Sequence, residues 1–150
     1  QEIQQRLRVY YQPYHEELAY QLEQLIEQFG KVYLFDLHSF YGPITDDICL
    51  GNGNGKSCSD FLIDAVDQAF AAEGYGVVRN KVFNGGYITR YYGSLPQVEA
   101  LQIEVRYPVY LDGCHLDHAV IPDWQVSQFD KAKAHFKRVF GQVAKTLSEN

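Results

Sequence analysis

The sequence has 150 residues, of which 46% are hydrophobic and 15% aromatic, and its formal net charge is −6. This length is that of one ordinary domain, and the composition excludes an intrinsically disordered chain. The acidic balance gives no basis for nucleic-acid binding, which shows as a basic patch or stripe. No apolar run approaches the roughly 20 residues that span a bilayer, so no membrane partner is expected either.

The cysteines and the first residue indicate the setting of the chain. Cys49, Cys58 and Cys114 are odd in number and widely spaced. Such a set does not indicate a disulfide framework, so a reducing cytoplasm is the expected compartment. The chain opens on Gln1 and contains no Met, which predicts that it is part of a longer chain.

The first element expected along the chain is an amphipathic helix. Pro13 suits its first turn and Gly30 its C-terminal cap. The apolar run at residues 32–35 then predicts a buried strand, which ends in the polar residues of the segment 36–39. The helix is indicated by apolar residues at three- and four-residue steps, namely Tyr14, Leu18, Leu22, Leu25, Ile26 and Phe29.

The remaining elements alternate between strands and helices. Strands are expected at residues 47–50, 75–79 and 100–105. Helices are expected from Ser57 or Ser59 to Gly74 and from Phe129 to Leu147, because apolar residues recur there at helical spacing. The Gly- and Tyr-rich segment 80–96 shows no period and is expected to be an irregular loop. This order of elements predicts α/β layers.

Two residues are candidates for catalysis. His38 follows a buried strand beside Asp36 and Ser39, where an imidazole can bind zinc through one nitrogen while a neighbouring oxygen holds the other. A hydrogen-bonded structural histidine fits the same pattern. Glu104 shares a strand face with Gln102, and a carboxylate in such an apolar strand faces solvent, pairs with a cation or serves a site.

Arginines provide candidates for holding an acidic substrate. Arg90 lies in the segment 85–93, and its planar guanidinium can bind a carboxylate through two hydrogen bonds, although a solvated loop arginine fits equally well. Arg79 and Arg106 are further candidates. Arg106 lies on the same strand face as Glu104 and could instead be the ion-pair partner of that residue.

Two other segments contain residues typical of binding sites. The Gly-rich loop 51–57 is similar to a phosphate-binding loop, but Leu50 stands where that motif requires glycine, so a flexible turn into a helix is favoured. The segment 114–118, Cys-His-Leu-Asp-His, contains potential metal ligands whose spacing matches no zinc pattern. A polar turn is favoured there.

Taken in order, several segments of the sequence resemble N-formylglutamate amidohydrolases. The resemblance runs from about Tyr14 to Asp112. It is carried by Asp36-Leu37-His38-Ser39, Asp47-Ile48-Cys49-Leu50-Gly51, Ser57-Cys58, Asn80, the segment Gly85-Gly86-Tyr87-Ile88-Thr89-Arg90-Tyr91-Tyr92-Gly93, Leu101-Gln102-Ile103-Glu104 and Tyr110-Leu111-Asp112.

The resemblance implies a fold and an activity. The fold would be an α/β three-layer sandwich with a mixed, mostly parallel central sheet flanked by helices, of the phosphorylase/hydrolase-like kind. The family is similar to zinc carboxypeptidases and aspartoacylases. Its members are expected to hydrolyse N-formyl-L-glutamate to formate and L-glutamate in histidine degradation.

The resemblance also assigns roles to residues. It makes His38 the last zinc ligand along the chain and Glu104 the carboxylate that activates water. The implied cofactor is one zinc ion, and the implied partner is a small-molecule substrate that carries carboxylates. The substrate contacts would be Arg90, Asn80, Tyr87 and Arg106, and the residues supporting the metal ligand would be Asp36 and Ser39.

The sequence also departs from the family pattern. The family's upstream His-Ser-Gly motif and acidic ligand do not occur in it, so residues 1–150 are expected to be a single domain that forms the C-terminal part of an amidohydrolase domain. Arg106, Tyr107 and Pro108 stand where the family often has Asn-Arg. Two alternatives follow: a truncated or degenerate homologue that binds acidic amino-acid derivatives without catalysis, and a phosphate- or nucleotide-binding module.

Overall fold

The structure is a computed structural model that describes residues 1–42, 44–111 and 127–149. Within these residues a four-stranded sheet has the order β1-β4-β2-β3. β1 pairs with β4, and β2 with β3, in parallel, whereas β2 and β4 are antiparallel. The predicted mixed, mostly parallel sheet is therefore confirmed. The strands are β1 (Val32–Phe40), β2 (Ile48–Gly51), β3 (Val77–Arg79) and β4 (Val98–Arg106).

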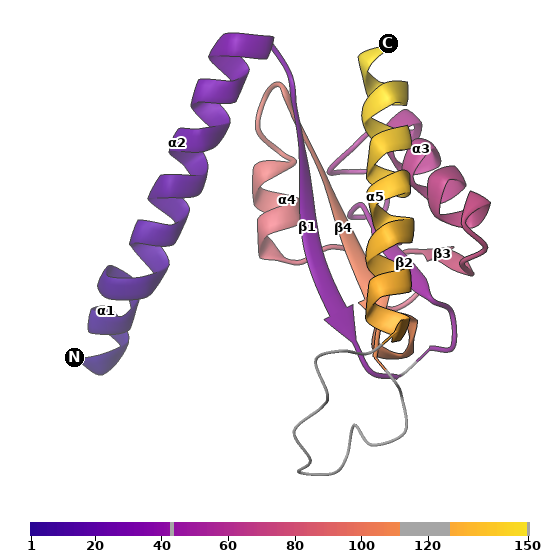
Figure 1. Ribbon diagram of the computed structural model, residues 1–150. Coiled ribbons are helices and arrows are strands. Elements are labelled where there is room, and N and C mark those ends of the chain that lie inside the picture. The colour runs from indigo at the N-terminus through magenta and orange to yellow at the C-terminus, as the bar shows by residue number, and fades with distance from the viewer. Residues whose placement is uncertain (43, 112–126, 150) are drawn as a thin grey trace.

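Helices lie on both faces of this sheet and give the expected layers (Figure 1). One face carries α3 and α5, and the other carries α2 and α4. The helices are α1 (Glu2–Arg6), the π-helix η1 (Leu7–Tyr11), α2 (Gln12–Phe29), α3 (Asp60–Ala72), α4 (Tyr87–Tyr92), the 3-10 helix η2 (Tyr107–Val109) and α5 (Ser127–Ser148).

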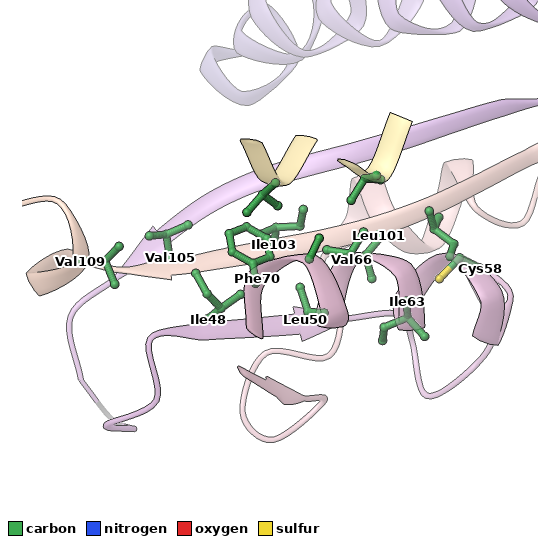
Figure 2. Packing of buried hydrophobic residues seen from close by; sticks show 14 of the residues in the cluster. Ile48, Leu50, Cys58, Ile63, Val66, Phe70, Leu101, Ile103, Val105 and Val109 are labelled. Carbon is green, nitrogen blue, oxygen red and sulfur yellow. The ribbon is translucent and has the colours of Figure 1, made fainter. Parts of the chain in front are cut away.

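The main core lies between the sheet and the α3–α5 layer. Alternate residues of the strands point to this face, and Figure 2 shows several of them packed against Phe70 and Val66 of α3. Burial of each such side chain contributes about 1.5–3 kcal/mol. The strand residues that supply this face are Ile48, Leu50, Leu101, Ile103 and Val105, and α5 adds Ala132, Val139 and Val143.

The opposite face of the sheet carries a second, smaller core. Leu22 of α2 packs there with Val32, Val98 and Tyr92, which come from β1, β4 and α4. Gly30 ends α2 with φ +78°, a left-handed conformation that suits glycine. The even-numbered residues of β1 and β4 point to this face, so it also receives their polar side chains.

The structure differs from the sequence-based prediction at two helices. Helical backbone begins at Glu2 rather than near Pro13, and the wider π-helical turn at Leu7–Tyr11 precedes the proline. The wider turn accommodates Pro13, because proline has no backbone N–H to donate and its ring crowds the helical turn before it. The segment 80–96, predicted to be a loop, contains α4, which is too short for a periodic pattern to show.

The described cysteines are buried free thiols. Cys49 and Cys58 form no disulfide, and burial raises the pKa of Cys58 to about 11. Cys114 and the rest of the segment 114–118 lie outside the described residues. In the part of the chain that the structure describes, no helix is both long and apolar enough to cross a bilayer.

Glu99 of β4 ties together the start of α3 and the start of β1. Its Oε2 accepts hydrogen bonds from the backbone N of Ser59, at 2.8 Å, and from the Ser59 hydroxyl, at 2.6 Å, while Oε1 forms an ion pair with Lys31. Ser59 in turn caps α3 by accepting from the N–H of Leu62. Burial alone would raise the pKa of Glu99, but the bonds from Lys31 and Ser59 outweigh it, so the pKa is lowered.

We predict that Glu99→Gln lowers the free energy of unfolding by about 1.5–3 kcal/mol at pH 7, because charge-assisted hydrogen bonds are lost. A lowered folded-state pKa means that the stabilisation is present above the ordinary value of 4.5 and is lost as the pH falls through the folded-state value. Urea unfolding at pH 7 and pH 3 measures this. A stability difference between variant and wild type that is the same at both pH values would contradict the prediction.

Gly51, the last residue of β2, lies against the segment 83–86. A Cβ at position 51 would stand 2.6 Å from the backbone N of Gly85 and 2.9 Å from the carbonyl oxygen of Phe83. Both contacts are with backbone, which cannot rotate away. Only glycine therefore allows this segment to pass so close to the sheet.

We predict that Gly51→Ala lowers the free energy of unfolding by roughly 1–3 kcal/mol, because the segment 83–86 has to move. Gly141→Ala is the matched control, since a Cβ at position 141 in α5 meets nothing within 4 Å. This control is expected to be neutral or stabilising by up to about 1 kcal/mol. Denaturant midpoints test the pair, and a wild-type midpoint for Gly51→Ala would refute the close-approach argument.

Candidate active site

The pairing of β1 with β4 brings the two candidate catalytic residues together. His38 is the register partner of Glu104, and Asp36 is the partner of Gln102. Residues paired in this way on neighbouring strands point to the same face of a sheet. The four side chains therefore lie on one face, which is the face covered by α4.

Glu104 is almost completely buried, with 5% of its surface exposed. Its Oε1 accepts a hydrogen bond of 2.6 Å from Gln102 Nε2, and Gln102 Oε1 accepts one of 2.7 Å from the backbone N of Gly86. On its other side Glu104 faces Cys49 of β2, which belongs to an apolar cluster with Phe40. One side-chain amide thus holds the carboxylate by a hydrogen bond, and apolar side chains lie beside it.

This environment changes the acidity of Glu104. Burial raises its pKa, while the hydrogen bond from Gln102 and the charge of His38 act in the opposite direction, and Asp36 raises it further. The net result is a raised pKa. A carboxylate with a raised pKa is a stronger proton acceptor than an exposed one, which suits a general base.

His38 lies at the open side of this group, and its side chain is 45% exposed. Its Nε2 lies 2.8 Å from Oδ1 of Asp36, whose side chain is 9% exposed. The other oxygen of Asp36 accepts a hydrogen bond of 2.9 Å from the hydroxyl of Thr89, a fully buried residue of α4. This chain of contacts orients the imidazole ring.

The surroundings of His38 fit a metal ligand. When the Nε2–H group donates a hydrogen bond to Asp36, the lone pair of Nδ1 is available, and no described residue forms a hydrogen bond with Nδ1. A ligating histidine commonly has its second nitrogen held by a carboxylate in this way. The described residues contain no group of three His, Cys, Asp or Glu that could hold a metal, so they do not complete the three-ligand set usual for catalytic zinc.

Arg90 lies next to this group rather than within it. It follows Thr89 in α4, is exposed, and its Nη2 donates a 2.5 Å hydrogen bond to Oδ1 of Asn84. Arg90 and Asn84 line a hollow of about 370 Å³ that is also bordered by the turn after β2. The short helix α4 thus contacts the His38 side through Thr89 and the hollow through Arg90.

Three other predicted site residues form hydrogen bonds or ion pairs with groups other than His38 and Glu104. Asn80 exchanges side-chain hydrogen bonds with the amide and backbone of Asn52. Arg106 donates to the carbonyl of Thr45 at 2.8 Å, and the described residues show no ion pair between Arg106 and Glu104. Arg79 forms ion pairs with two carboxylates of α3, at Asp64 and Asp67.

The structure does not bring Ser39 and Tyr87 together with the core of the site. Ser39 pairs with Val105, so it points to the opposite face of the sheet from His38. Tyr87 begins α4, is 56% exposed and stacks on Tyr91 with ring centroids 5.3 Å apart. A hydrogen bond with Tyr11 raises the pKa of Tyr87. Their predicted roles stay predictions.

The loop 51–57 forms a closed turn rather than a phosphate cradle. Its backbone N–H groups at residues 53, 55, 56 and 57 already donate hydrogen bonds, either to Asn52 or to the carbonyl of Asn84. Most N–H groups of this loop are therefore not free to form an anion cradle. The favoured interpretation, a turn that leads into a helix, agrees with this geometry.

Sequence reasoning missed two residues that support the site. Gln102 was recognised only as a neighbour of Glu104 on the strand face, and that alternation was the available signal. Thr89 carried no such signal, because α4 was not expected and the contact with Asp36 joins residues 53 positions apart.

The sequence is similar to those of known proteins. The family model described as N-formylglutamate amidohydrolase matches residues 1–111. An N-formylglutamate deformylase of Pseudomonas putida is 37% identical over 111 residues, which cover 68% of this chain and 42% of that protein. The deformylase of Pseudomonas aeruginosa is 38% identical over 109 residues, covering 67% and 41%. The chain thus spans less than half the length of these curated relatives.

Solved structures give the same result. The crystal structure of an N-formylglutamate amidohydrolase from Ralstonia eutropha JMP134 superposes with a TM-score of 0.79 at 25% identity, covering 98% of this chain and 54% of that one. A protein of Agrobacterium tumefaciens shares the fold with a TM-score of 0.65 at 19% identity, covering 96% of this chain and 52% of that one. The family model's match over residues 1–111 and the curated relatives show that this chain belongs to the N-formylglutamate amidohydrolase family.

Proposed function

We propose that this chain carries part of the active site of a zinc-dependent amidohydrolase that converts N-formyl-L-glutamate and water to formate and L-glutamate. The observation that carries this proposal is the buried carboxylate of Glu104 directly opposite the half-exposed imidazole of His38. The names of the Pseudomonas relatives support the substrate.

His38 is the residue of this chain that would hold the metal. Bound there, zinc would polarise the substrate carbonyl and lower the pKa of water. Asp36 fixes the ring through Nε2, and Thr89 fixes Asp36, so Nδ1 is directed by two successive hydrogen bonds. This preorganisation keeps the imidazole in one orientation.

Glu104 is the proposed general base. Gln102 occupies Oε1, which leaves Oε2 to take the proton from water and later deliver it to the departing amine. The apolar cluster beside Glu104 limits water around the carboxylate. The raised pKa of Glu104 lies closer to neutral pH than its ordinary value of 4.5. Gln102 in turn depends on Gly86, so the segment 83–86 positions the base indirectly.

Arg90 is the proposed contact for a substrate carboxylate. Its guanidinium is held by a neutral amide oxygen, that of Asn84, and therefore keeps its full charge for an anionic ligand. Binding the substrate at a fixed distance from Glu104 would place the formyl carbon at the reacting groups. Asn80, Tyr87 and Arg106 stay predictions as additional contacts.

A second candidate function is binding of acidic amino-acid derivatives without turnover by this chain alone. It is favoured by the lack of a three-ligand metal group within the described residues. The role in histidine degradation and the cytoplasmic compartment are proposals that rest on the family resemblance.

Glu104→Gln is expected to lower kcat for N-formyl-L-glutamate by about 10²–10⁴-fold in the protein that contains residues 1–150, because the amide cannot accept the proton. The substitution preserves shape, so thermal stability and zinc content should stay near wild type. Glu23→Gln, an equally conservative change at an exposed position of α2, is the control and should leave kcat unchanged. Near-normal turnover by Glu104→Gln would remove this residue from the mechanism.

Zinc content separates the two candidate functions. We expect the catalytic protein to hold about one zinc per chain, and His38→Ala to weaken zinc binding by at least about 10-fold, because a ligand is lost. Elemental analysis after dialysis against a graded chelator series measures this. Wild-type zinc retention by His38→Ala would show that the metal, if present, is held elsewhere.

A further inference from the structure

The hollow beside α4 lies between two segments that are far apart in the sequence. On one side is the turn after β2, which contributes Gly53, Asn54 and Lys56. On the other are Asn84 and Arg90, from the segment that leads into α4 and from α4 itself. Its volume of about 370 Å³ is that of a small-molecule subsite rather than of a macromolecular groove.

The charges around this hollow are all of one sign. Lys56 and Arg90 are the charged side chains among the described residues that line it, and no acidic residue is among them. Neither cation forms an ion pair in residues 1–42, 44–111 and 127–149, whereas Lys31, Arg79, Lys81 and Arg138 all do. Two unneutralised cations at one hollow attract an anion and repel each other when none is bound.

The type of anion follows from the groups that are free to bind it. The backbone N–H groups of residues 53, 55, 56 and 57 already donate hydrogen bonds, so the turn does not offer the full set of free amides that a phosphate cradle uses. The charged donors at the hollow are the planar guanidinium of Arg90 and the flexible ammonium of Lys56. A planar carboxylate suits the first, and the second adds a point charge on a mobile stem.

Two short stretches of chain connect residues that line the hollow with residues that contact the candidate catalytic group. Asn84 lines the hollow, and two residues later Gly86 donates to Gln102, which holds Glu104. In α4, Arg90 faces the hollow while its neighbour Thr89 contacts Asp36. Both connections run through the segment 84–90, which therefore links the hollow with the surroundings of Glu104 and His38.

We propose that Lys56 and Arg90 together bind the side-chain carboxylate of the N-acyl amino acid in this hollow, and that Lys56 determines selectivity for acidic over neutral side chains. This rests on the proposed function, and it assigns the far end of the substrate to a second site. Arg90 provides the directional hydrogen bonds. Lys56 provides a positive charge that attracts a carboxylate but gives no such attraction to a neutral substrate side chain.

The test compares binding of N-formyl-L-glutamate with that of N-formyl-L-glutamine, whose side chain ends in a neutral amide. Dissociation constants come from calorimetry or NMR titration of the Glu104→Gln protein, which is expected to turn over the ligand too slowly to disturb the titration, with and without Lys56→Gln. We expect Lys56→Gln to weaken binding of N-formyl-L-glutamate about 10-fold and to leave N-formyl-L-glutamine unchanged within about twofold. Lys81→Gln is the matched control, because Lys81 is exposed, pairs with Asp46 and lies outside the hollow.

Three outcomes would overturn the proposal: equal loss of affinity for both ligands, no change for either ligand, or no measurable binding of N-formyl-L-glutamate to the Glu104→Gln protein that keeps Lys56. Because the readout is equilibrium binding, its result is separate from that of the turnover assays. Selective binding without hydrolysis would retain this subsite and contradict the proposed catalysis. Hydrolysis by the protein together with unchanged binding selectivity in Lys56→Gln would support the proposed catalysis and contradict this subsite.

Discussion

The parallel pairing of β1 with β4 is the interaction on which the site depends. It sets His38 beside Glu104 and Asp36 beside Gln102, so four polar side chains from two segments meet on one face of the sheet. Main-chain hydrogen bonds fix these positions more firmly than loops could, because strands supported on both faces move little. The sheet therefore sets the positions of the site residues, and contacts from the helices, such as that of Thr89 with Asp36, orient their side chains.

Burying these polar groups has a cost that the surrounding network offsets. A carboxylate inside a protein is destabilising unless it is hydrogen-bonded, and Glu104 receives such a bond from Gln102. Gln102 is satisfied by Gly86, and Asp36 by Thr89 and His38. The segment that supplies Gly86 can approach because Gly51 has no side chain. A backbone requirement at the end of β2 thus supports the proposed proton acceptor on β4.

Much of this arrangement follows from local patterns in the sequence. Strand alternation predicted that Glu104 and Gln102 share a face, and the run before Asp36 indicated the strand that presents His38. The layers on either side of the sheet also followed from the order of elements. The contacts of Thr89 and Lys56 could not be predicted, because each depends on how distant segments meet. The six residues of α4 are stabilised by packing rather than by a periodic pattern.

Successive side chains of β1 point to opposite faces of the sheet, so the site depends on the register of β1 against β4. Asp36 and His38 point toward α4, while Leu37 points to the other side and is 63% exposed. If β1 shifted by a single residue against β4, Leu37 or Ser39 would take the place beside Glu104, and both the imidazole and its aspartate would turn away from it. The sheet could keep most of its hydrogen bonds after such a shift. A chain with this shifted register would thus have native-like secondary structure and yet lack the contacts that the proposed chemistry requires.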